Sequence, residues 1–98
     1  MTEKPRVTVR LTSGLTEEPL AFEAEIVEGG SRTSHRVTMD SATREHMGCT
    51  GMDPVRCVEA AFRFLLEREP KEAIMVQFDI TVIGRYFPQF FREIGRYY

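Results

Sequence analysis

One short stretch of the chain contains most of the residue types that perform chemistry. Residues 44–57 read REHMGCTGMDPVRC and hold two cysteines, a histidine and two arginines. Unpaired backbone amides at a helix N-terminus carry partial positive charge, which stabilises a thiolate or a bound anion. Because a helix is expected to begin near the end of this stretch, Arg44, His46, Cys49 and Gly51 form a candidate anion or thiol site.

A second interpretation is that the same stretch is only a loop leading into a helix. Its glycines allow tight turns, and a cysteine at the margin of a helix's apolar stripe, such as Cys57, commonly acts as a small hydrophobic residue. The spacing of eight from Cys49 to Cys57 is not the C-x-x-C of redox motifs. With His46 they give three irregularly spaced metal ligands, whereas a structural zinc site needs four. We therefore favour the loop and expect reduced thiols, no metal and no cofactor.

The remaining polar residues form no recognisable catalytic set. The sequence has no nucleophile–base–acid trio and no glycine motif for phosphate. His35 falls on the apolar face of a predicted strand, where we expect a partly buried side chain with a hydrogen-bond partner. Glu23 and Glu25 share a wet strand face, and solvated charges are common in that position. The sequence therefore favours a protein that is not an enzyme.

The C-terminal segment, residues 85–98, combines aromatic side chains with arginines. Tyr, Phe and Arg are enriched where proteins meet. Once one helix covers the sheet, several apolar side chains lack a neighbour, so either the tail folds back over them or a second copy of the chain covers them. We favour the second copy. The candidate interface residues are Phe64, Met75, Ile83, Tyr86, Phe87, Phe90, Phe91 and Tyr97.

Composition and charge limit the possible functions. The 98 residues are 42% hydrophobic and 29% charged, with a net charge of −2, which are ordinary values for one globular domain. A net negative charge disfavours general binding of polyanions. Residues 85–98 nevertheless hold three arginines and one glutamate, so nucleic-acid binding by this aromatic tail is kept as an alternative. The absence of a signal-peptide pattern and of a membrane-length apolar run favours a cytoplasmic protein with no membrane partner.

Alternation of apolar and polar residues predicts the strands that position these groups. Short connections between the first three strands favour an antiparallel meander. The predicted strands cover residues 6–12, 20–27, 34–40 and 73–83. The last strand follows a helical crossover, so it is expected beside the first strand or in the sheet of a second subunit.

A helix start is the clearest local signal in the sequence. Asp53 can cap the unpaired amides, and Pro54 suits the first helical position. Apolar residues then recur at helical spacing, and the helix should end near Glu69 because Pro70 disfavours helical geometry in the residue before it. A second, short helix is predicted over residues 88–94.

The run FLLEREPKEAIMVQFDITVIGRYFP, residues 64–88, resembles a family of short bacterial proteins to which no activity is assigned. The resemblance implies a bacterial, single-domain α+β protein and transfers no functional residue. We expect one domain over residues 1–98, with residues 1–5 disordered. Its fold should be α+β: an antiparallel sheet in β-β-β-α-β order, one amphipathic helix on one face and a short C-terminal helical tail.

The function expected from the sequence is that of a small interaction or regulatory module without enzymatic activity. It would act as a homodimer through the last strand and the aromatic tail, and a different protein partner is also open. The alternatives are nucleic-acid binding by the tail and a thiol or anion site around Cys49.

Overall fold

The computed structural model describes residues 4–98, and its first half is the meander that the sequence predicts. The strands are β1 (Arg6–Leu11), β2 (Leu20–Glu28) and β3 (Ser31–Met39). They pair antiparallel, and Gly29 and Gly30 turn the β2–β3 hairpin with φ of 55° and 82°, a region that favours glycine. The sequence predicts disorder over residues 1–5, and the first three of these residues lie outside the described part of the chain.

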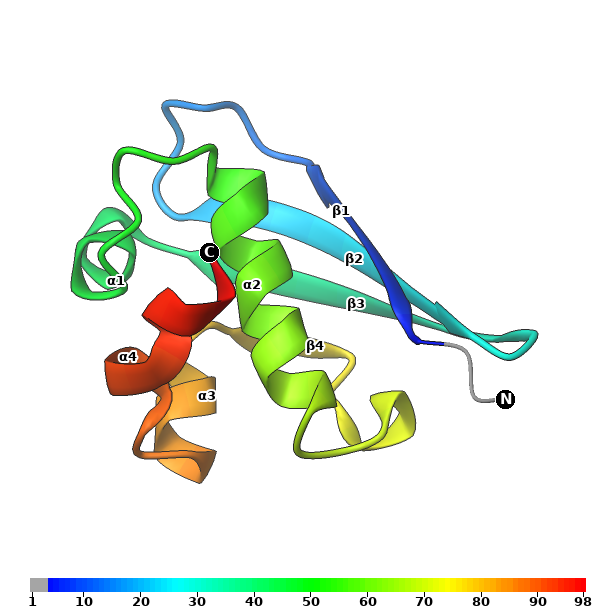
Figure 1. The fold of residues 1–98 in the computed structure, drawn as a ribbon. Helices are drawn as coiled ribbons and strands as arrows, with labels where there is room; N and C mark the ends of the chain where they lie inside the picture. Colours follow the sequence, from blue (N-terminus) through cyan, green and yellow to red (C-terminus); the bar gives the residue numbers. More distant parts are fainter. Residues whose placement is uncertain (1–3) are drawn as a thin grey trace.

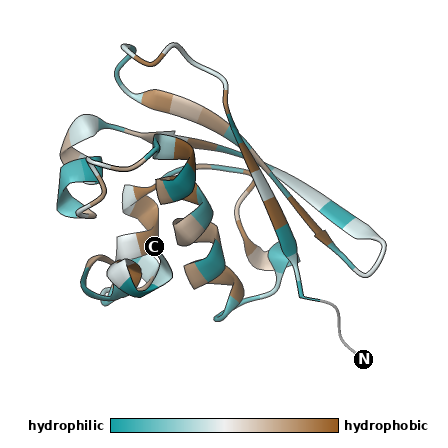
Figure 2. Cartoon of the chain, turned by 45° about the horizontal axis from the view of Figure 1, so that its top comes forward, coloured by the Kyte–Doolittle hydropathy of each residue, from teal (hydrophilic) through white to brown (hydrophobic). Residues whose placement is uncertain are grey.

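One face of the sheet is apolar and the other is polar. Phe22, Ile26 and Val37 are buried on the inner face, and segments of opposite hydropathy alternate along the strands in Figure 2. The outer face carries cross-strand ion pairs, of which Arg10–Glu23 is 3.3 Å long. The sheet therefore needs a covering layer on one side only.

Helix α2 (Pro54–Leu66) supplies that layer (Figure 1). It begins as predicted, since Pro54 is the first helical residue and the Asp53 carboxylate accepts from the Val55 N–H at 2.9 Å. The buried side chains of α2 include Val58, Ala61 and Phe62. The helix ends at Leu66, three residues before the predicted end.

The fourth strand differs from the prediction in its length, its neighbour and its direction. β4 spans only Gln77–Asp79, and it pairs parallel with β3, so the sheet is mixed with the order β1-β2-β3-β4. The expected all-antiparallel sheet is wrong, and β4 lies beside β3 rather than beside β1. A strand–helix–strand connection brings the chain back in its original direction, which favours parallel pairing.

The last three residues of the predicted strand belong to helix α3 (Thr81–Tyr86). The Asp79 carboxylate accepts from the Thr81 N–H at 3.0 Å and from the Thr81 hydroxyl at 2.7 Å, which holds the first turn. Ile80 and Ile83 are both buried and are spaced as on one helix face. The strand thus ends at Asp79, inside a run of alternating apolar and polar residues.

Two short helices complete the fold. Helix α4 (Phe90–Glu93) lies in the predicted C-terminal helical region and continues as a 3₁₀ turn over Ile94–Tyr97. Helix α1 (Ser41–His46) was not predicted; the Asp40 carboxylate caps it by accepting from the Thr43 N–H at 2.7 Å. Hydrogen bonds to Thr43 lower the pKa of Asp40. Within residues 4–98, no helix is both long and apolar enough to span a bilayer.

Gly84 allows α3 and α4 to pack closely. A β-carbon at this position would lie 2.8 Å from Cε2 of Phe91, so Gly84→Ala should lower the free energy of unfolding by about 1–2 kcal/mol, despite the better helix propensity of alanine. Urea denaturation followed by circular dichroism measures the change. Gly95→Ala is the control, because its added β-carbon meets nothing within 4 Å. Equal stability of the two variants would show that α3 and α4 do not pack this closely.

Candidate functional site

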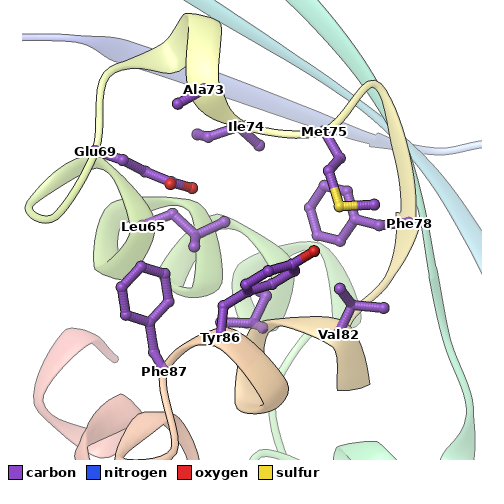
Figure 3. Close-up of a pocket in the computed structure, with 10 residues that line it drawn as sticks. Leu65, Glu69, Ala73, Ile74, Met75, Phe78, Val82, Tyr86 and Phe87 are labelled. Carbon is purple, nitrogen blue, oxygen red and sulfur yellow. The ribbon is translucent and has the colours of Figure 1, made fainter.

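One concavity of the described residues is a pocket of about 320 Å³ beside the C-terminal half of α2 (Figure 3). Its walls come from α2, the 3₁₀ turn Lys71–Ala73, β4 and α3. The lining residues are Leu65, Glu69, Ala73, Ile74, Met75, Phe78, Val82, Ile83, Tyr86 and Phe87. A pocket of this size and lining is at the small end of sites that bind organic molecules.

Buried contacts fix the turn that forms one wall of the pocket. Lys71 is only 4% exposed, and its ammonium donates to Glu72 at 2.6 Å and lies 3.9 Å from Glu28 at the β2–β3 hairpin. The hydrogen bond from Lys71 lowers the pKa of Glu72. This network ties the pocket wall to the sheet.

A second buried contact fixes the segment that enters β4. His35 is buried, and its Nδ1–H donates to the Met75 carbonyl at 2.7 Å while Nε2 accepts from the Thr33 hydroxyl at 2.9 Å. This confirms the expectation of a histidine with a hydrogen-bond partner. Its role is to join β3 to the segment before β4.

Glu69 is the one charged side chain among the pocket residues. Figure 3 shows its carboxylate directed between Leu65 and Ile74 into the pocket. Among residues 4–98 this carboxylate has no ion pair and no hydrogen-bond donor, and burial raises its pKa. The pocket therefore offers an apolar surface with one unpaired acidic group.

The mouth of the pocket is formed by exposed apolar side chains. Tyr86 is 69% exposed and Met75 is 43% exposed, and both lie on the open side in Figure 3. These two residues were predicted as interface residues, and they are accessible. Glu69 was not predicted, because the sequence marks it only as the residue before Pro70.

The predicted thiols are not free in the structure. Cys49 and Cys57 form a disulfide with their Cα atoms 6.2 Å apart, so the expectation of reduced thiols is wrong. Gly48, with φ of 71°, turns the loop back, and the Cys49 N–H donates to the Arg44 carbonyl at 3.3 Å. This turn places Cys49 beside the first turn of α2, which the spacing in the sequence does not reveal.

The remaining residues of the predicted anion site do not converge. The Arg44 guanidinium donates to the Met52 carbonyl inside the loop, and the His46 ring packs edge-on against Phe91 with centroids 4.1 Å apart. Gly51 is exposed. The loop is a disulfide-closed connection between α1 and α2, and the buried Nε of Arg44 in it has no hydrogen-bond partner among the described residues.

Most of the predicted interface residues are packed within the chain itself. Phe64, Ile83 and Phe90 are buried in the core. Three more are partly buried against that core: Phe87, Phe91 and Tyr97. The tail folds back along α2, and the C-terminus lies beside that helix in Figure 1. These side chains contribute to the chain's own core.

Two tyrosines of the tail form hydrogen bonds within the chain. The Tyr97 hydroxyl accepts from Arg68 at 3.2 Å, and the Tyr98 hydroxyl donates to the Met47 carbonyl at 2.7 Å. Desolvation of Tyr98 raises its pKa. Arg85, Arg92 and Arg96 are exposed, and so is the Tyr86 ring beside Arg85, so nucleic-acid binding by the tail stays a prediction.

Comparison of the chain with models of protein families, with curated proteins and with solved structures finds no match. The resemblance of residues 64–88 to a family of short bacterial proteins therefore stays a prediction. The function has to be argued from the geometry of the chain.

Proposed function

We propose that the protein is a small binding module without enzymatic activity that forms a homodimer through the free edge of β4 and the apolar residues beside it. The observation that carries this proposal is Val76, which is 72% exposed next to the outer edge of the sheet. Met75, beside it, is also exposed. An apolar pair at an open strand edge is a favourable place for association.

The backbone of β4 supports the proposal. The Val76 carbonyl accepts from the Arg36 N–H at 2.7 Å, and the Ile80 N–H donates to the Thr38 carbonyl at 3.0 Å, so these residues turn their backbone groups toward β3. Backbone groups alternate along a strand. Gln77 and Asp79 therefore direct theirs to the open side, where a further strand can pair.

A second copy of the chain is the partner that we propose for this edge. Twofold self-association is the commonest assembly of soluble proteins, and a twofold axis beside β4 would bring Val76 of each copy close together. The aromatic tail, which the sequence analysis included in the interface, packs within the chain. The proposed dimer therefore rests on the last strand alone.

Val76→Glu is expected to weaken the dimer by at least about tenfold, because it places two carboxylates near the axis and removes apolar contact. Light scattering coupled to size exclusion, over a range of protein concentrations, measures the mass. Leu15→Glu is a matched control, since Leu15 is also 72% exposed but lies in the β1–β2 loop. A wild-type protein that stays monomeric at every concentration, or equal masses for the two variants, would refute the dimer.

A further inference from the structure

The pocket beside α2 has an unbalanced charge. Its lining includes one carboxylate, that of Glu69, and no Lys, Arg or His. All other lining side chains are apolar except for the hydroxyl of Tyr86. A carboxylate that faces an apolar cavity loses hydration and gains most from a cation that enters the same space.

The basic residues that are closest to Glu69 in sequence are engaged elsewhere. The Arg68 guanidinium pairs with Glu93 at 3.0 Å and lies 3.7 Å above the Phe64 ring. Lys71 is buried and paired with Glu72. Neither of them neutralises Glu69, so the charge in the pocket is left for an external group.

The aromatic residues in the pocket wall also favour a positively charged ligand. Figure 3 shows the Tyr86 ring along the side of the pocket that lies opposite Ala73 and Ile74. The face of a tyrosine ring attracts cations within about 6 Å, most strongly where water is excluded. Phe78 and Phe87 provide apolar area for the rest of a ligand.

We propose that this pocket binds a small organic ammonium ion with an aromatic or alkyl body, whose ammonium group pairs with Glu69. The volume of about 320 Å³ admits a one-ring or short-chain amine. The inference goes beyond the proposed dimer, because Val76 and Gln77 at the open edge do not line the pocket, and Met75 is the one residue that the two sites share.

The test uses 2-phenylethylammonium as the probe and phenylacetate as a comparator with a similar body and the opposite charge. In an NMR titration of the amide resonances at neutral pH, the amine should bind at a single site and shift residues that line the pocket. Phenylacetate should bind at least about tenfold more weakly. Equal affinities, or no saturation by the amine up to roughly 10 mM, would overturn the proposal.

Two variants locate the site. Glu69→Gln should weaken amine binding about tenfold and leave the affinity for phenylacetate within about twofold, because it removes only the charge. Glu67→Gln is its control: Glu67 is an exposed carboxylate two residues earlier that does not line the pocket, and amine affinity should be unchanged. An equal effect of the two variants would contradict the pairing with Glu69.

Ala73→Phe tests the cavity itself. Ala73 lines the pocket and is exposed, so a larger side chain can fill the space without disturbing the core. This variant should lose most of its amine binding while its spectrum stays that of the folded protein. Retained binding would place the amine elsewhere. Val76→Glu should still bind the amine, which separates failure of the dimer from failure of the pocket.

Discussion

Replacing Phe64 with alanine should lower the free energy of unfolding by about 3–5 kcal/mol, the usual cost of truncating a buried phenylalanine. Phe64 is 0% exposed. Its ring centroid lies 5.0 Å from that of Phe90, 5.9 Å from Phe87 and 5.7 Å from Tyr97. The ring is therefore the centre of the aromatic cluster that joins the tail to α2, and its removal leaves a cavity on the tail side of the helix.

The loss should be large compared with the total stability, since domains of this size are stable by roughly 5–15 kcal/mol. Urea denaturation followed by circular dichroism measures it, and amide exchange over residues 87–97 should accelerate because the tail loses its main contact. Tyr86→Ala is the control, because Tyr86 is also aromatic but 69% exposed. If the two variants were equally stable, the tail would not be packed on Phe64 in solution.

The local signals in the sequence predict the first half of the fold well. The meander follows from period-two alternation, and the start of α2 follows from Asp53 and Pro54. These features are set by neighbouring residues, so a single sequence is sufficient. Neighbouring residues do not set the direction of β4, because that direction depends on how the crossover returns to the sheet.

The sequence of residues 73–83 explains why the predicted last strand is longer than β4. The run alternates in hydropathy, but Ile80, Ile83 and Phe87 also recur at helical spacing. The same residues therefore fit both a strand and a helix, and the hydrogen bonds from Thr81 to the Asp79 carboxylate favour the helical turn that follows. The alternation groups Val76 with Phe78 and Ile80, whereas the structure buries those two side chains and leaves Val76 exposed.

The candidate sites were harder to predict than the elements. The sequence shows that the tail is rich in apolar side chains, and folding of the tail back over the chain is one of the two arrangements that it predicts. The pocket was not visible, since it needs the turn held by Lys71, the end of α2 and α3 together. The sequence does not show that Glu69 lacks an ion pair, because this depends on Arg68 and Lys71 pairing with other carboxylates in the folded chain.

Loss of the Cys49–Cys57 disulfide should cost about 2–3 kcal/mol, because the bond closes a short loop and so restricts the unfolded chain. The two cysteines are eight positions apart and both are 0% exposed. Reductant should therefore lower the Tm by roughly 10–20 °C for a domain of this size. Thermal unfolding with and without reductant, together with a thiol count before and after reduction, measures the effect.

The reduced protein should stay folded below this lower Tm, because the loop keeps other contacts. Arg44 still holds the Met52 carbonyl, and the Met52 N–H still donates to the Cys49 carbonyl at 3.0 Å. Replacement of both cysteines by alanine provides the control: this variant should be insensitive to reductant. If reductant lowered its Tm as much as that of the wild type, the effect would not come from this bond. Two titratable thiols in the untreated protein would show that the loop keeps Cys49 and Cys57 apart in solution.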